Sequence, residues 1–150
     1  MKECWQKTAR SRLRFELGGL AFALQKGASP EEYAHHLWGK GARTWIGKDE
    51  PSAAEYLAKE AEAFRCFYPN VAFEVTGAGE ESAELVFTEG CLGGWGDKPW
   101  AMASSLGLNK EDVCRYCREA FRLWAGQLGL SATTGLGEDN RCRLNVYREG

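Results

Sequence analysis

The sequence predicts an α+β fold in which a small antiparallel sheet of about four strands packs against helices on one face. Two changes of hydrophobic period support this prediction. Over the first 70 residues apolar side chains recur at helical spacing, whereas from 71 to 87 they alternate with polar ones, as in a half-buried strand. Helical spacing returns after residue 109, and a second pair of strand-like runs follows it. Placing the helices on one side of a sheet buries both patterns economically.

Three helices are expected before the first strand, over about residues 10–25, 30–45 and 52–68. Residues 1–10 are expected to be a loose start. The second helix has the clearest beginning, because Ser29 and Glu32 can form a capping box around Pro30.

The remaining elements are two hairpins and two helices. The expected ranges are strands 71–75 and 83–87, a short helix 100–106, a long helix 109–128, and strands 130–135 and 141–148. Asn109 is the predicted cap of the long helix, and Glu111 and Asp112 favour its positive end.

Size and composition limit the possible classes of protein. The chain has 150 residues, of which 44% are hydrophobic, so we expect one domain with a real core. A net charge of −2 argues against a general nucleic-acid binder. No stretch approaches the roughly 20 apolar residues of a membrane span, and no signal peptide is convincing. We therefore expect a cytoplasmic protein with no nucleic-acid or membrane partner.

Charge is unevenly distributed along the chain. Residues 1–14 carry a net charge of +4, whereas the stretch 74–97 holds six acidic residues and no basic one. One interpretation is a basic helix end and a solvated sheet surface. The other is an interaction protein that docks through an acidic face.

The best candidate site lies between Glu89 and Cys117 and is completed by Cys142. Its first part is dense in glycine, which is costly to order, and it contains Trp95 and Trp100 as a possible lid. An aromatic set could form the wall of an apolar pocket for a cofactor or small molecule: Trp38, Trp45, Trp95, Trp100 and Trp124, with Phe87 and Phe121. Core packing is an equally good interpretation of these rings.

The cysteines suggest a metal site. Cys114 and Cys117 form an i, i+3 pair on a helix, and Cys91, Cys142 or a histidine could complete a tetrahedral site for zinc or another transition metal. Buried core thiols are the alternative. A thioredoxin-like redox role is disfavoured, because Cys114 comes five residues after the predicted helix cap.

A catalytic interpretation uses Cys91 as a nucleophile. This residue follows a strand inside a glycine-rich turn, where backbone N–H groups could converge on an oxyanion, and His35 or His36 would be the base. A partly exposed pair at a helix surface is the more usual interpretation of two such histidines.

The C-terminal half, over about residues 71–148, resembles two related families. Residues 137–144 are similar to the closing hairpin of the small-molecule-binding domain of the 4-vinyl reductase type. The order Cys91, Cys114 or Cys117, then Cys142 resembles the L-2-amino-thiazoline-4-carboxylate hydrolase-like group. The resemblance implies an α+β ligand-binding fold, often a homodimer, with a sensor role or hydrolysis of a small sulfur heterocycle.

This chain departs from the family pattern at one point. Metal-binding members of the 4-vinyl reductase type carry a Glu-x-x-Cys pair before the terminal turn, where this chain has Ser-Ala-Thr-Thr at 131–134. The family zinc site therefore cannot be carried over intact. Three hypotheses remain: a domain that binds a small molecule or metal cofactor, a thiol- or metal-dependent hydrolase of a C–N or C–S bond, and an interaction protein.

Overall fold

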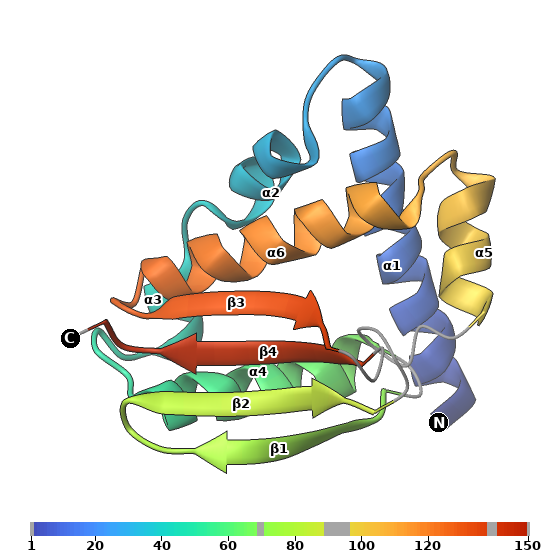
Figure 1. Cartoon of the computed structure of the whole chain (residues 1–150). Helices are drawn as coiled ribbons and strands as arrows, with labels where there is room; N and C mark the ends of the chain where they lie inside the picture. The colour runs from blue at the N-terminus through green and yellow to red at the C-terminus, as the bar shows by residue number, and fades with distance from the viewer. Residues whose placement is uncertain (1, 69–70, 89–96, 138–140, 150) are drawn as a thin grey trace.

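The computed structural model describes residues 2–68, 71–88, 97–137 and 141–149 (Figure 1). The helices of this part are α1 (Lys2–Gln25), α2 (Pro30–Trp38), α3 (Ala42–Ile46), α4 (Ala53–Phe67), α5 (Asp97–Ser105) and α6 (Lys110–Gly126). The strands are β1 (Phe73–Ala78), β2 (Ser82–Phe87), β3 (Ser131–Leu136) and β4 (Cys142–Tyr147).

The four strands form one antiparallel sheet in the order β1-β2-β4-β3. Both predicted hairpins are present, and they join through the central pair β2 and β4, where Leu85 lies opposite Leu144 and Ala83 opposite Val146. These four side chains are buried on the inner face. Period-two alternation therefore placed the apolar side chains on one face, as predicted.

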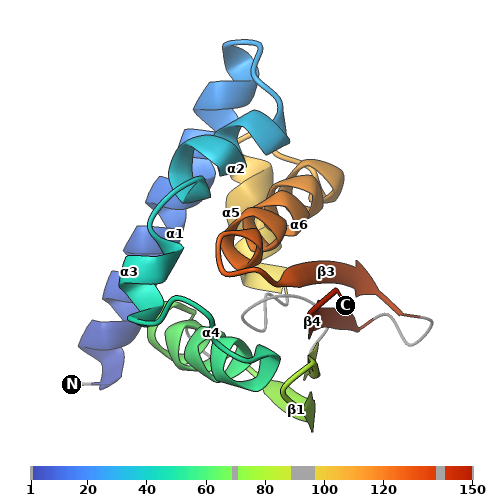
Figure 2. The same cartoon turned by 90° about the vertical axis from the view of Figure 1, so that its left-hand side faces the viewer.

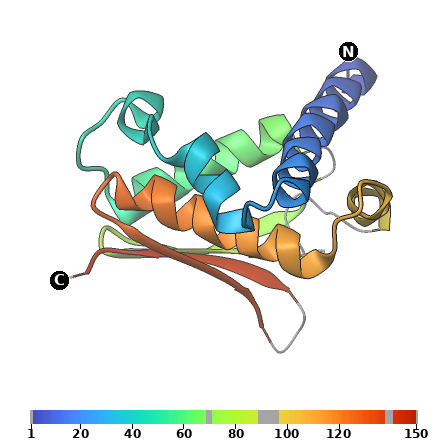
Figure 3. The ribbon, with the colours of Figure 1, turned by 90° about the horizontal axis from the view of Figure 1, so that it is seen from above.

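The helices cover a single face of the sheet in two layers. Helices α4 and α6 lie directly on the strands, with α6 over β3 and α4 over β2 and β1. Helices α1, α2 and α3 lie on the side of α4 and α6 that faces away from the sheet (Figures 2 and 3). The predicted α+β class, with helices on one face of a four-stranded sheet, is confirmed.

The core between α4, α6 and the sheet is aromatic. The Phe64 ring packs against Phe87 and Phe121, with ring centroids 5.4 and 5.8 Å apart. Phe73 lies 6.3 Å from both Phe64 and Phe87 and extends this cluster across the first hairpin. Such rings bury much apolar area and hold α4 at a fixed position on the sheet.

The N-terminal residues form the beginning of α1, so the expected loose start over residues 1–10 was wrong for the described part. The Trp5 indole Nε1 donates a hydrogen bond to the Cys66 carbonyl oxygen at 2.8 Å, and Ala9 is buried. Contact with the end of α4 supplies the stability that local sequence lacks, because most helical stability in proteins comes from tertiary packing.

The second predicted helix is divided into α2 and α3. Gly41 has a φ of +108°, a left-handed conformation that favours glycine and ends the continuous helix. The Gln127 side chain stabilises the break: its Oε1 accepts from the Ala42 N–H at 3.1 Å and its Nε2 donates to the Trp38 carbonyl at 2.7 Å. The break lets Trp38 and Trp45 both reach the same partner, Trp124, with ring centroids 5.4 and 5.6 Å away.

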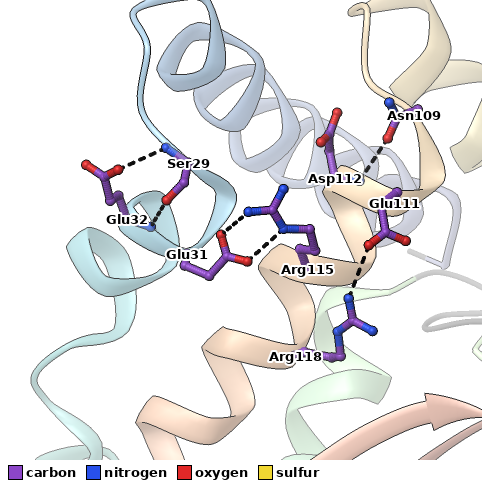
Figure 4. Close-up of polar contacts among 8 residues, drawn as sticks. All are labelled: Ser29, Glu31, Glu32, Asn109, Glu111, Asp112, Arg115 and Arg118. Carbon is purple, nitrogen blue, oxygen red and sulfur yellow. Dashed lines mark hydrogen bonds and ion pairs between the residues drawn. The ribbon is translucent and has the colours of Figure 1, made fainter.

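Caps and an ion pair fix the relation between α2 and α6 (Figure 4). The predicted capping box is present, since Ser29 Oγ accepts from the Glu32 N–H at 3.1 Å and Glu32 Oε1 accepts from the Ser29 N–H at 3.2 Å. Asn109 caps α6 through a 2.9 Å bond from the Asp112 N–H.

The same view shows how the two helices are joined. The Arg115 guanidinium of α6 donates two hydrogen bonds, of 2.8 and 2.7 Å, to the Glu31 carboxylate of α2 (Figure 4). A bidentate pair of this kind adds orientation as well as attraction. It fixes α2 beside α6, and so the position of Trp38 at the end of α2.

Candidate functional site

A cavity of about 290 Å³ lies among the helices, close to the lower limit of volumes typical of ligand pockets. Its aromatic lining consists of Trp38, Trp45, Phe64, Phe67, Tyr68, Tyr116, Phe121 and Trp124. Every lining residue belongs to α1, α2, α3, α4 or α6, except Tyr68, which caps α4. We call this cavity the aromatic pocket.

Helical spacing explains how two of the walls form. Residues 116, 117, 120, 121 and 124 of α6 lie on one helix face, as do residues 60, 63, 64 and 67 of α4. Each set alternates large rings with small side chains such as Ala63 and Ala120. The small residues leave the space that the rings enclose.

A chain of polar contacts closes one end of the pocket. The Trp38 Nε1 donates to the Tyr116 hydroxyl at 2.8 Å, and that hydroxyl donates to Glu16 Oε2. The other carboxylate oxygen of Glu16 accepts from Arg12 Nη1 at 2.9 Å. Burial, together with the negative charge of Glu16, raises the pKa of Tyr116 far above its ordinary value, so this hydroxyl stays a donor.

Glu60 is the other notable group in the pocket. It is only 6% exposed, and it is the one charged residue that is buried in the described part of the chain. Burial raises the pKa of the Glu60 carboxyl to about 8, and the nearby Tyr56 side chain opposes part of that rise. The contact with Tyr56 favours the ionised carboxyl, but it offsets only part of the cost of burying the charge.

Tyr56 lies beside Glu60 on the same helix. Its hydroxyl is fully buried and has no hydrogen-bond partner among the described residues, although it lies close enough to Glu60 for each to influence the pKa of the other. The Glu60 carboxyl therefore lies in a mostly aromatic lining, and no salt bridge within the described part of the chain involves it. A ligand with a hydrogen-bond donor could bind Glu60 there.

The predicted cysteine site is divided in the structure. Cys117 lines the aromatic pocket, whereas Cys114 is half-buried close to Cys142 of β4. Burial raises the pKa of both the Cys114 and the Cys142 thiols, and the charge of Cys114 raises the Cys142 pKa further. Cys91 lies outside the described residues.

The predicted metal ligands are therefore not brought together by the described part of the chain. Across residues 2–68, 71–88, 97–137 and 141–149, no group of three or more His, Cys, Asp or Glu side chains could hold a metal ion. Cys114 and Cys142 lie close enough to interact. A metal site that Cys91 would complete beside these two thiols stays a prediction.

The predicted catalytic bases lie away from the pocket. His35 and His36 are exposed on α2, and neither lines the aromatic pocket. Because Cys91 is outside the described residues, the expected pairing of a cysteine nucleophile with a histidine also stays a prediction.

The four predicted cofactor-binding aromatics have different positions. Trp45 lines the pocket. Phe87 is fully buried between α4 and the sheet, where it packs against Phe64, and it does not line the pocket. Trp95 and the side chain of Trp100 lie outside the described residues, so the expected lid stays a prediction.

Sequence analysis did not select Glu60, Glu16 or Tyr116. A usable signal was present, because Glu60 interrupts the apolar stripe of α4 and Glu16 interrupts that of α1. A charged residue in the buried stripe of an amphipathic helix is unusual and indicates a partner or a function.

Among the described helices, none combines the length and the apolar character needed to cross a membrane.

Comparisons with known proteins show no family for this chain. Searches against protein-family models, curated proteins and solved structures find no match to this chain.

Proposed function

We propose that this protein is a cytoplasmic binding domain that takes a small molecule with an aromatic or apolar body into the aromatic pocket. The observation that carries the proposal is the combination of eight aromatic side chains around a cavity of about 290 Å³ with one buried carboxyl, Glu60. Ligand pockets typically join an apolar lining to a few placed polar groups.

The apolar lining favours a ligand with an apolar body, because surface removed from water contributes roughly 25 cal/mol per Å². A donor on the same ligand would add a hydrogen bond to the Glu60 carboxyl. The cytoplasmic part of the proposal is supported by Cys4, Cys66, Cys114 and Cys142, which form no disulfide with one another in the described part of the chain, as suits a reducing compartment.

The hydrolase alternative has weaker support. Cys114 and Cys142 have raised thiol pKa values, and a raised pKa lowers the fraction of nucleophilic thiolate at neutral pH. A hydrolase would therefore need Cys91 or Cys117. The resemblance to the 4-vinyl reductase type, its homodimer and its bound metal remain predictions, and metal analysis of the purified protein and its mass in solution would test them.

The interaction alternative depends on the acidic stretch 74–97. Glu74, Glu80 and Glu81 are exposed there, as a solvated sheet edge requires. Exposed glutamates fit a solvated sheet surface as well as an acidic docking face, so they do not favour the interaction alternative over ligand binding in the pocket.

The proposal can be tested by filling the cavity instead of removing its walls. Ala120→Phe places a ring where Ala120 lines the pocket, and Ala101→Phe adds the same ring at an exposed position of α5. The probe is 1-naphthalenemethanol, and binding is followed by titration calorimetry. We expect the probe to bind the unmodified protein and A101F alike, and A120F to bind about tenfold or more weakly, a loss of about 1.4 kcal/mol or more.

Circular dichroism must show that A120F remains folded for this comparison. Equal binding by folded A120F, or failure of the unmodified protein to bind any naphthalene probe, whether neutral, cationic or anionic, would overturn the proposed function.

A further inference from the structure

The charges that line the aromatic pocket do not balance when Glu60 is ionised. They come from Arg12, Glu16 and Glu60. Arg12 is bound to Glu16 at 2.9 Å, so these two charges cancel within the pocket. Tyr116 adds a further hydrogen bond to Glu16 and strengthens the pair. The net charge of the lining is therefore set by Glu60: zero when protonated and −1 when ionised.

Among the described residues that line the pocket, no cation compensates Glu60. The titratable groups around it are Tyr56 on α4 and Tyr68 at its end, Arg12 and Glu16 on α1, and Tyr116 and Cys117 on α6. Arg12 alone among these is cationic, and its charge does not contribute to the pKa of Glu60. The tyrosines are neutral, since burial raises the pKa of Tyr56, Tyr68 and Tyr116 above the ordinary value.

The rest of the lining also suits a cation. Trp38, Trp45 and Trp124 form a continuous cluster, with Trp124 5.4 and 5.6 Å from the other two ring centroids. The face of an indole ring carries partial negative charge and attracts ammonium groups, most strongly where water is excluded. The pocket thus combines three indole rings, an apolar lining and one uncompensated carboxyl.

We propose that the ligand of the aromatic pocket carries a protonated amine on an aromatic body, and that its ammonium group binds the Glu60 carboxylate beside the tryptophan rings. This inference rests on the proposed function and names the class of ligand. The ammonium supplies a cationic donor to Glu60, whereas the one cation of the described lining, Arg12, is bound to Glu16, and the aromatic body fills the space among the rings.

The inference has a consequence for protons. With its pKa raised to about 8, Glu60 is mostly protonated at pH 7 in the free protein. An arriving ammonium favours the carboxylate, so the Glu60 proton passes to the buffer as the ion pair forms. Binding should release about one proton at pH 7, and affinity should rise roughly tenfold per pH unit up to about pH 8.

Three probes with the same ring system and different charge test the inference. They are 1-naphthylmethylamine, 1-naphthalenemethanol and 1-naphthoate, titrated by calorimetry at pH 6 and pH 8. At pH 8 we expect the amine to bind about tenfold or more tightly than the alcohol, with the carboxylate weakest. Repeating the pH 7 titration in phosphate and in Tris gives the number of protons released.

Two variants identify the responsible group. Glu60→Gln keeps the shape and removes the charge, so it should abolish the preference for the amine and the proton release while the alcohol still binds. Glu62→Gln removes an exposed carboxylate on the same helix. It should change neither the preference for the amine nor the number of protons released. Binding of the alcohol by E60Q also shows that this variant is folded.

The outcomes separate the two proposals. If the alcohol or the carboxylate binds as well as the amine at pH 8, or if E60Q keeps the preference, the inference fails and the proposed function stands. If none of the probes binds the unmodified protein, both fail.

Discussion

The Tyr33 hydroxyl occupies the space that a side chain at Gly19 would need. A Cβ built on Gly19 would overlap the Tyr33 hydroxyl oxygen. The Tyr33 hydroxyl donates a 2.7 Å hydrogen bond to the Glu16 carbonyl of α1. The ring centroids of Tyr33 and Tyr116 lie 5.3 Å apart. The two consecutive glycines inside α1 therefore differ in purpose, because nothing lies within 4 Å of a Cβ at Gly18.

This difference predicts opposite effects of the same substitution. Gly18→Ala should stabilise the protein by up to about 1 kcal/mol, because alanine is the better helix former. Gly19→Ala should destabilise it by about 1–3 kcal/mol, because the new methyl group displaces Tyr33 from its hydrogen bond. Denaturant unfolding measures both, and a G19A variant as stable as G18A would contradict the assignment.

Removing the Tyr116 hydroxyl should destabilise the polar end of the pocket. Tyr116→Phe leaves the Trp38 Nε1 and Glu16 Oε2 without their shared partner, at an expected cost of about 1–3 kcal/mol in unfolding free energy. Tyr147→Phe, on the opposite face of the sheet, is the matched control and should change stability by less than about 0.5 kcal/mol. Equal stability of the two variants would show that the contacts contribute little.

Glu60 should make the protein less stable as the pH rises. Its pKa is raised from 4.5 to about 8 on folding, so the folded state binds more protons than the unfolded state between these values. Stability from this group is fully present below pH 4.5 and is lost as the pH rises to about 8, by at most about 1.4 kcal/mol per unit.

Unfolding free energies measured at pH 5, 6.5 and 8 check this slope. Glu60→Gln does not titrate and should remove the contribution, whereas the exposed Glu62→Gln should retain it. A slope that is identical in the two variants would assign the pH dependence to another group.

The thiols should differ in reactivity. Cys4 and Cys66 are exposed, whereas Cys114 and Cys142 are partly buried and have raised pKa values. Iodoacetamide at pH 7.5, followed by peptide mass spectrometry, should modify the first pair roughly tenfold or more faster, because the thiolate is the reactive form. Modification of Cys142 at the rate of Cys66 would contradict this expectation. If a bound naphthalene probe slows the modification of Cys117 and of no other thiol, the probe lies in the aromatic pocket, which Cys117 lines.

Local pattern was sufficient for most of the fold. Ser29, Glu32 and Asn109 cap the helices that the sequence predicted, and alternation placed Leu85 and Leu144 on the inner face. Signals of this kind act within a few residues, so they can be read from a single chain. The extension of α1 was missed because it depends on Trp5 contacting Cys66, 61 residues away.

The site was harder to predict, because it is assembled from five helices. The sequence predicted a site around the cysteines and the segment 89–100, and it also predicted an aromatic-walled pocket. Trp38, Trp45, Trp124 and Phe121 of that predicted wall line the observed cavity, whereas Phe87 does not. Nothing local indicated that α1 and α4 would supply the other walls. Glu60 was detectable only as a charge out of place in an apolar stripe.

Within the described part of the chain, no strand residue lines the aromatic pocket. Strand pairing and the proposed ligand binding would thus depend on separate sets of side chains, while α4 and α6 both line the pocket and contact the sheet. Substitutions at Trp38, Trp45 or Ala63 would therefore change the proposed specificity without altering any residue of the sheet. A chain built this way could acquire a new specificity while its strands stay the same.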